Sequence, residues 1–407
     1  MRRMAWVVLI AAFGCAHQPQ TPAGAAVQAI NRFAADLYGQ VRQGQGNQVF
    51  SPLSVHTALS MAAAGARGET EAQMWRVLRN APDRSLAHRS LGTLLRQNNA
   101  PAADTKLKVL NRIYGEQSFS FEPSFLQRLE ADYAAPLTAV DFFGAAPQAT
   151  AAINAWVDET TEGKVQRLVP AGGLGRCTRL VLVNAVYFLG HWAAPFRAEA
   201  TRPEPFFSAD GRSDDIPTMV QTGNFRYREH GDAQILELPY RDRQNSMVIL
   251  LPRERDGLAR LEADVVEDGF SDYMTTEEAT RVEVHLPKFE FTTATDVVPA
   301  LERLGMRAAF DPAQADFSGV GRSEAPDGCD KPLAIDDIFH KAFVAVDELG
   351  TEAAAATAIA LIELTSAGPP EPEPILFRAD HPFLFVLKDG SGAALFVGRV
   401  DHLPTSG

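Results

Sequence analysis

Residues 347–358 read Asp-Glu-Leu-Gly-Thr-Glu-Ala-Ala-Ala-Ala-Thr-Ala, a segment made mostly of small side chains. Its four consecutive alanines favour a helix, whereas the run Ile-Ala-Leu-Ile-Glu-Leu that follows at residues 359–364 favours a strand. Read at the period of a strand, one face of the segment is uncharged throughout, with Thr351, Ala353, Ala355, Thr357, Ile359 and Leu361. The conflicting signals indicate a segment that changes its secondary structure. An Ala-rich surface helix or linker is the alternative for this segment alone.

Further motifs occur in a fixed order along the chain. They are Asn-Gln-Val-Phe-Ser-Pro-Leu-Ser at 47–54, Ala-Leu-Ser-Met at 58–61, Gly-Ala-Arg-Gly-Glu-Thr at 65–70, Ile-Asn-Ala-Trp-Val at 153–157, Thr-Glu-Gly-Lys-Val at 161–165, Asn-Ala-Val-Tyr-Phe-Leu-Gly-His-Trp at 184–192, Leu-Pro-Lys-Phe at 286–289, His-Lys-Ala at 340–342 and Phe-Arg-Ala-Asp-His-Pro-Phe-Leu-Phe at 377–385. Together they resemble the serpin family of serine protease inhibitors, from about residue 29 to residue 403. The resemblance implies a mixed α/β (α+β) fold with about three β-sheets, several helices and an exposed reactive-centre loop.

The resemblance implies roles for two groups of residues. The loop hinge corresponds to Glu348, Gly350, Thr351, Glu352, Ala353, Ala354, Ala355, Ala356 and Thr357. The sheet-opening region corresponds to Asn47, Ser51, Ser54, Asn184, Trp192, Lys288 and His340. Glu348 and Lys288 are expected to form an ion pair near Trp192, with two exposed charges as the alternative. Gly350 is expected to adopt a backbone conformation forbidden to other residues, and Thr351 to be the first side chain that enters the sheet.

The other five polar residues of the sheet-opening region are Asn47, Ser51, Ser54, Asn184 and His340. They are expected to form one polar cluster behind the insertion gap, whose members bond to one another.

In the implied mechanism the loop acts once, as a substrate for the target protease. In serpins the target protease cleaves the loop, forms an acyl-enzyme and is trapped when the loop inserts into the main sheet. With the loop at about residues 347–374, the usual loop length places the reactive bond between Leu364 and Thr365. Glu363, Ile362 and Thr365 are alternatives for the residue on the acyl side. Leu364 suits chymotrypsin-like, elastase-like or subtilisin-like proteases, which have apolar specificity pockets.

Two other interpretations compete with an inhibitor. Non-inhibitory relatives that act as binding proteins tend to carry bulky, charged or Pro residues in the hinge, where this chain has Thr351 and four alanines. A hydrolytic enzyme would need a nucleophile and a base, but the sequence has no GxSxG motif. It also lacks HExxH, CxxC, P-loop and GxGxxG motifs, so no metal or cofactor is expected.

Composition limits the domain number and the partners. The chain has 407 residues and 46% hydrophobic content, without an internal repeat or long linker, and so predicts one domain at residues 29–407. A formal net charge of −13 argues against nucleic acid as a partner. Several arginines lie between residues 76 and 96, where some serpins bind polyanions, but a solvated helix face is the simpler interpretation. We expect a monomer.

The N-terminus reads as an export signal of the bacterial lipoprotein type. Met-Arg-Arg is followed by an apolar run that is too short to span a bilayer and ends at Gly14 and Cys15. We expect residues 1–14 to be removed, Cys15 to be lipidated as a membrane tether, and residues 15–28 to form a flexible linker. The protein would then be an outer-membrane lipoprotein, periplasmic or at the cell surface. Cleavage after Ala16 and release to the outside is the alternative.

The family resemblance also implies a place for two of the three cysteines. It puts Cys177 and Cys329 near the lower ends of the two strands that flank the insertion gap. Export favours oxidation, so a disulfide between them would limit how far the lower sheet opens. Two separate thiols are the alternative, because sequence alone reveals neither distance nor connectivity.

Overall fold

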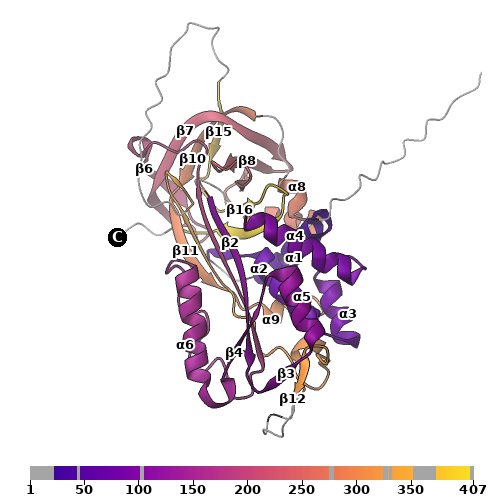
Figure 1. The fold of residues 1–407 in the computed structure, drawn as a ribbon. Coiled ribbons are helices and arrows are strands. Elements are labelled where there is room, and N and C mark those ends of the chain that lie inside the picture. Colours follow the sequence, from indigo (N-terminus) through magenta and orange to yellow (C-terminus); the bar gives the residue numbers. More distant parts are fainter. Residues whose placement is uncertain are drawn as a thin grey trace, which may run out of the picture.

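The computed structural model describes residues 23–43, 46–100, 105–274, 279–323, 329, 332–351 and 373–403, with backbone only for 105–111, 184–187 and 323. Four groups of predicted features lie outside these residues: the export signal, Cys15, the hinge residues 352–357, and the reactive bond between Leu364 and Thr365. The described residues do include strand β14, Gly350–Thr351, at the start of the loop and strand β15, Ile375–Arg378, after it. Figure 1 shows how the described helices and strands are arranged.

The helices gather mainly in the first third of the chain (Figure 1). The α-helices of the described residues are α1 Gly24–Val41, α2 Pro52–Ala63, α3 Gly68–Val77, α4 Arg84–Asn98, α5 Pro123–Tyr133, α6 Phe142–Thr160, α7 Leu258–Asp268, α8 Phe270–Met274 and α9 Val298–Arg303, with 3₁₀ turns at Ala198–Ala200 and Ala308–Phe310. Helix α2 starts where the motif predicts, because Ser51 caps it by accepting a hydrogen bond from the Ser54 amide and Pro52 occupies the first turn.

The predicted linker, residues 15–28, extends too far along the chain, because its last residues belong to the folded domain. Helix α1 begins at Gly24, and Ala26 and Val27 are already buried. These residues continue the apolar face of Ile30 and Phe33, which gives the helix an extra turn of buried surface. The folded domain therefore starts about five residues before position 29.

The larger sheet has nine strands in the described residues. Its order is β1-β17-β16-β9-β8-β7-β10-β15, and β6 also pairs with β7. The strands are β1 Gln48–Phe50, β6 Arg202–Phe207, β7 Ser213–His230, β8 Ala233–Pro239, β9 Ser246–Pro252, β10 Ala279–Pro287, β15 Ile375–Arg378, β16 Phe383–Lys388 and β17 Ala394–Val400. All pairs are antiparallel except β10 with β15.

The second sheet has six strands in the order β11-β13-β14-β5-β2-β4. Its strands are β2 Thr105–Glu116, β4 Leu137–Val140, β5 Leu180–His191, β11 Phe289–Ala294, β13 Lys341–Val346 and β14 Gly350–Thr351. A two-stranded sheet of β3 Phe119–Phe121 and β12 Gly321–Ser323 lies at one end. The described part of the chain thus has three sheets and several helices, as the family resemblance implies.

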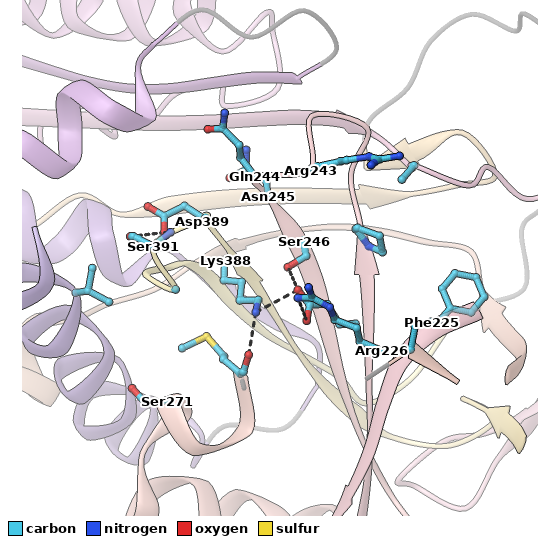
Figure 2. Close-up of a pocket in the computed structure, with 18 of the residues that line it drawn as sticks. Phe225, Arg226, Arg243, Gln244, Asn245, Ser246, Ser271, Lys388, Asp389 and Ser391 are labelled. Carbon is cyan, nitrogen blue, oxygen red and sulfur yellow. Dashed lines mark hydrogen bonds and ion pairs between the residues drawn. The ribbon is translucent and has the colours of Figure 1, made fainter. Parts of the chain in front are cut away.

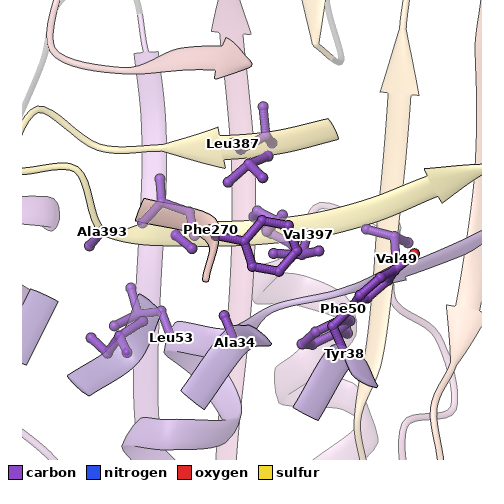
Figure 3. Packing of buried hydrophobic residues seen from close by; sticks show 14 of the residues in the cluster. Ala34, Tyr38, Val49, Phe50, Leu53, Phe270, Leu387, Ala393 and Val397 are labelled. Atoms are coloured by element: carbon purple, nitrogen blue, oxygen red, sulfur yellow. The ribbon is translucent and has the colours of Figure 1, made fainter. Parts of the chain in front are cut away.

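Hydrophobic residues form two separate clusters. The main core joins α1, α2 and α8 to the larger sheet, and Figure 3 shows Tyr38, Phe50, Leu53, Phe270 and Val397 within it. The smaller cluster lies under α6. It contains Phe142, Ile153 and Val157 of α6. It also contains Tyr114 of β2 and Val181 and Val183 of β5. Side chains alternate along a strand, so β5 contributes to a different apolar layer on each face.

Candidate functional site

The site starts at a tight turn between β13 and β14. The Asp347 carboxylate accepts hydrogen bonds from the amides of Leu349 (2.8 Å) and Gly350 (3.1 Å), and the Asp347 amide donates to the Gly350 carbonyl (2.9 Å). An Asp at this position stabilises a turn by bonding to the backbone two residues later. The turn leads the chain from β13 into the place next to β5.

Gly350 is required here because the backbones approach closely. A Cβ atom at Gly350 would lie 1.9 Å from the carbonyl oxygen of Gly190 on β5. The φ angle of Gly350 is outside the left-handed region. The expectation that Gly350 supplies a forbidden backbone conformation is therefore wrong, since the constraint is steric contact with the neighbouring strand.

Thr351 points into the protein and is buried, with 2% of its surface exposed. Its hydroxyl lies 2.6 Å from the hydroxyl of Tyr240, and the Tyr240 ring stacks on Trp192 at a centroid distance of 4.7 Å. The indole nitrogen of Trp192 donates to the Asp347 carbonyl (3.0 Å). Burial raises the pKa of Tyr240 well above its ordinary value, so its hydroxyl stays protonated. A buried hydroxyl pair therefore holds the first inserted side chain.

Tyr240 was not predicted as part of the site. It directly follows β8, in the larger sheet, and only tertiary packing brings it to Thr351. No motif spacing in the sequence connects the two residues.

Glu348 forms the expected ion pair. Its carboxylate accepts hydrogen bonds from Lys288 Nζ (2.8 Å) and from the Thr201 hydroxyl (2.8 Å), a partner that the sequence did not reveal. The Glu348 carbonyl also accepts from the Phe196 amide (2.9 Å). Burial alone would raise the pKa of Glu348, but its hydrogen bonds outweigh burial and lower that pKa. The charged side chain is thus fixed at the top of the sheet beside Trp192.

In the lower part of the sheet-opening region, the described polar contacts join His340, Ser51 and Ser54. His340 Nε2 accepts a hydrogen bond from the Ser51 amide (3.1 Å), and Ser51 Oγ accepts from the Ser54 amide (3.1 Å). Of Asn184 the structure describes only the backbone, which pairs with Asn111. Desolvation lowers the pKa of His340 to about 4, in agreement with a neutral ring that accepts at Nε2.

Asn47 does not belong to this group, contrary to the prediction. Its amide oxygen accepts from the backbone amides of Asp401 (2.8 Å) and His402 (3.1 Å), and its amide nitrogen donates to the His402 carbonyl (2.8 Å). Asn47 therefore fastens the start of β1 to the end of β17. The shared motif at residues 47–54 misled the prediction, because β1 separates Asn47 from Ser51.

Strand β14 lies between β13 and β5 only at their upper ends. Thr351 pairs with Val346 of β13 and with Gly190 of β5, and Gly350 pairs with His191. Within the residues that the structure describes, no ladder joins β5 directly to β13. Below Thr351 the two strands are therefore not paired with each other, and we call this interval between β5 and β13 the gap.

A disulfide joins the chain segments at the foot of this gap. Cys177 and Cys329 are bonded, with a Cα–Cα distance of 5.4 Å, and Cys177 precedes Leu180, the first residue of β5, by three positions. The alternative of two separate thiols is therefore wrong in this structure.

Other expected sites can be compared with the described residues. No group of three or more His, Cys, Asp or Glu among them could hold a metal ion. Of the arginines between residues 76 and 96, Arg79 pairs with Asp36 (2.7 Å) and Arg84 with Glu71 (2.9 Å), as is typical of a solvated helix face. In the part of the chain with assigned structure, no helix has the length and apolar character needed to cross a bilayer.

A pocket of about 780 Å³ lies next to the turn between β16 and β17 (Figure 2). At its base, Lys388 bonds to Glu237 (3.1 Å) and to the Met274 carbonyl (2.8 Å), while Ser246 donates to Glu237 (2.7 Å). The buried charges of the pocket are thus already satisfied by protein groups.

The fold and site define a protein whose six-stranded sheet holds the two-residue strand β14 between β13 and β5. A family model described as Serpin (serine protease inhibitor) matches residues 28–403. The leukocyte elastase inhibitor of Sus scrofa is 39% identical over 384 residues, which cover 91% of this chain and 98% of that protein. An uncharacterized serpin-like protein of Thermococcus kodakarensis is 38% identical over 376 residues, 92% of this chain and 85% of that protein.

Solved structures agree with these sequence matches. Cleaved Serpin 42Da superposes with a TM-score of 0.82 and 31% identity over 94% of this chain and 100% of that chain. The thermophilic serpin Tengpin in its native state gives a TM-score of 0.80 with 28% identity over 93% and 94% of the two chains. The chain belongs to the serpin family.

Proposed function

We propose that this serpin is an irreversible, suicide-substrate inhibitor of serine proteases. The observation that carries the proposal is the position of Thr351, which is buried against Tyr240 at the upper end of a gap between β5 and β13. A loop that has started to insert needs only cleavage to continue. Each further ladder hydrogen bond would contribute roughly 0.5 to 1.5 kcal/mol, so about ten residues add on the order of 10 kcal/mol.

The sequence of the hinge supports the same function. Residues 353–356 are all alanine, and alanines can enter a sheet without a large desolvation cost or a bulky side chain to rearrange. A serpin-fold binding protein that does not inhibit remains the second candidate, and it would not require such a hinge. The relatives named leukocyte elastase inhibitor favour inhibition.

We propose Leu364 and Thr365 as the reactive bond. No Arg or Lys lies between Glu352 and Phe377, which disfavours trypsin-like targets. Chymotrypsin-like, elastase-like and subtilisin-like proteases have pockets that take apolar side chains.

The test is incubation of the purified protein with a panel of these proteases and with trypsin. A complex that survives denaturing electrophoresis supports inhibition, and simple hydrolysis by every protease contradicts it. Mass spectrometry of the small C-terminal fragment locates the bond. A fragment that starts at Thr365 supports Leu364, and one that starts at Leu364 supports Glu363.

We also propose export with lipid attachment at Cys15, which would hold the inhibitor at a bacterial membrane or cell surface. The support is the apolar run that ends at Gly14 and Cys15 and the polar residues after it. Metabolic labelling with a fatty acid, compared between the native chain and Cys15→Ser, tests this placement.

A further inference from the structure

Two buried histidines lie at the end of the larger sheet that contains β6, β10 and β15 (Figure 1). His285 is in β10 with 1% of its surface exposed, and His381 follows β15 with 5% exposed. The His285 backbone pairs with Arg378 of β15, and its carbonyl accepts from the Ala379 amide (3.0 Å). Neither histidine belongs to the hinge or to the sheet-opening region.

The ring of His285 lies between two carboxylates. Its Nδ1 is 2.8 Å from Glu204 Oε2, and its Nε2 is 3.0 Å from Glu283 Oε1. Glu204 comes from β6 and also binds Arg202 through its other oxygen (2.8 Å). An ionised carboxylate only accepts hydrogen bonds, and a neutral imidazole has only one N–H donor. Both contacts are therefore hydrogen bonds only when the ring of His285 carries protons on both nitrogens.

The ring of His381 also lies between two acceptors. Its Nδ1 is 2.7 Å from Asp380 Oδ1, and its Nε2 is 2.8 Å from the carbonyl oxygen of Pro252 at the end of β9. Burial would raise the pKa of Asp380, but its hydrogen bond with His381 and the charges of His381 and Arg255 outweigh burial and lower that pKa. Asp380 is thus ionised and only accepts, so His381 also needs protons on both nitrogens.

His285 and His381 differ in this respect from His340, whose Nε2 accepts a hydrogen bond from the Ser51 amide. Burial by itself favours a neutral ring. In His285 and His381, however, a neutral ring would place an unprotonated nitrogen against an acceptor, where two lone pairs repel each other. The protonated ring is the form that the surrounding groups favour.

Both rings belong to one set of contacts around the end of β15. Phe207, the last residue of β6, donates from its amide to the Asp380 carbonyl (2.8 Å). Arg255 lies over the Phe207 ring and pairs with the Asp380 carboxylate (3.4 Å). Since His285 binds β6 through Glu204 and His381 binds the end of β9, the end of β15 is attached to three strands through groups that contact the two rings.

We propose that His285 and His381 form a pH-sensitive clasp that holds the end of β15 to β6, β9 and β10 and releases it as the pH rises above neutral. The charged groups around the two rings are Glu204, Glu283, Asp380, Arg202, Arg255 and, opposite His285 in the ladder, Arg378. Strand β15 directly follows the loop, so the clasp fixes the chain at that end of the loop. The clasp goes beyond the proposed function and does not depend on it.

The sign of the pH dependence follows from the two protons. In an opened form the rings are exposed to water, where histidine titrates near pH 6.5. A proton that is held in the clasp and lost in the opened form makes opening more favourable with rising pH, by up to about tenfold per pH unit for each histidine. This sign is opposite to that for a buried neutral ring such as His340.

The test measures backbone hydrogen exchange of the intact chain at pH 6, 7, 8 and 9 by mass spectrometry. The reporters are peptides that contain the amides of Phe207 and Ala379, which bond across the clasp. Protection is expressed relative to the unfolded sequence at the same pH, because exchange itself is base-catalysed. Peptides from β16 and β17, in the same sheet, are the internal control.

We expect the protection of both reporters to fall between pH 7 and pH 9, by up to about tenfold per pH unit for each histidine, while β16 and β17 stay unchanged. His285→Gln and His381→Gln should each remove one of the two contributions to this slope. His230→Gln changes another histidine of the same sheet, in β7, and should leave the slope as it is.

A second measurement on the native chain does not depend on the folding of variants. Selective labelling of histidine with nitrogen-15 distinguishes protonated from unprotonated ring nitrogens, and we expect at least two rings with protons on both nitrogens at pH 7.5. Absence of such rings would overturn the clasp, as would reporter protection that does not change with pH or an equal slope in all three variants. Failure to form protease complexes would contradict inhibition alone.

Discussion

The hydroxyl of Thr351 is hydrogen-bonded to the hydroxyl of Tyr240, which comes from a different sheet and lies 111 positions earlier in the chain. Tyr240 is completely buried and stacked on Trp192, so its position is set by the core and not by the loop. The residues that contact Thr351 are therefore held in place by the core and do not depend on the loop.

Replacement of Thr351 by Arg should convert the inhibitor into a substrate. A guanidinium without a partner in this buried place would cost several kcal/mol and delay insertion, so the acyl-enzyme would have time to hydrolyse. We expect Thr351→Arg to be cleaved with little covalent complex, measured as the number of inhibitor molecules consumed per protease. Thr351→Ser keeps the hydroxyl and should still form the complex. Equal turnover of the native chain and Thr351→Arg would favour a binding protein.

Cleavage of the loop should raise the thermal stability of the whole protein. Insertion would convert exposed chain into a central strand, which adds ladder hydrogen bonds on the order of 10 kcal/mol in total. We expect the midpoint of thermal unfolding to rise by roughly 10 °C or more. Calorimetry of intact and loop-cleaved protein, side by side, makes the comparison. An unchanged or lower midpoint would mean that the intact fold stores no such energy.

Mild acid should destabilise the intact protein through its buried histidines. Desolvation is the main cause that lowers the pKa of His56, His88 and His340 from 6.5 to about 4. Between these values the unfolded chain binds protons that the folded protein does not bind. The free energy of unfolding therefore falls as the pH drops from 6.5 towards 4, by up to about 3 kcal/mol for each histidine.

Denaturant unfolding at several pH values between 7 and 5 measures the slope of the free energy of unfolding against pH. In this range most carboxylates do not yet titrate. His340→Gln removes one of the three groups and keeps a side chain that can accept from the Ser51 amide. The slope should become smaller in this variant. A slope that does not change would show that His340 does not contribute.

Loss of the Glu348–Lys288 ion pair should have a small effect on the free energy of unfolding and a larger effect on how long the protein keeps its inhibitory activity. Lys288 is partly exposed, so solvent screens the pair and its removal should cost no more than about 1 kcal/mol. Glu348→Gln keeps the bond from Thr201 but loses the charge. We expect a faster spontaneous loss of inhibitory activity on storage at 37 °C. Lys288→Met and the double variant complete a mutant cycle, and additive effects of the two changes would show that the pair is not coupled.

The local parts of the fold could be predicted from the sequence because they depend on short motifs. Ser51 followed by Pro52 signals the start of a helix, and α2 begins there. The ion pair of Glu348 was available from the family resemblance. Each of these features is either encoded within a few residues or shared by the family.

Tertiary contacts could not be predicted in the same way. Tyr240 and Thr201 reach the hinge only because two sheets pack together. Asn47 was assigned to the wrong neighbours because a motif does not tell which side chains face one another across a strand. The need for Gly350 was predicted, but its cause, the nearby Gly190 carbonyl, requires coordinates.

The apolar cluster under α6 gives the inserted strand a second dry surface. Thr351 faces the main core, as does Phe188 of β5, whereas Val181 and Val183 face α6. In the register of Thr351 and Gly190, a strand that continues between β5 and β13 would lie against this cluster at the rungs of Val183 and Val181, opposite Ala358 and Ala360. A polar substitution at either alanine should then damage trapping as much as one on the core side, whereas the upper end of the same face already carries Glu352. Helix α6 thus restricts tolerance to mutation at the lower rungs of the sheet and not at the upper ones.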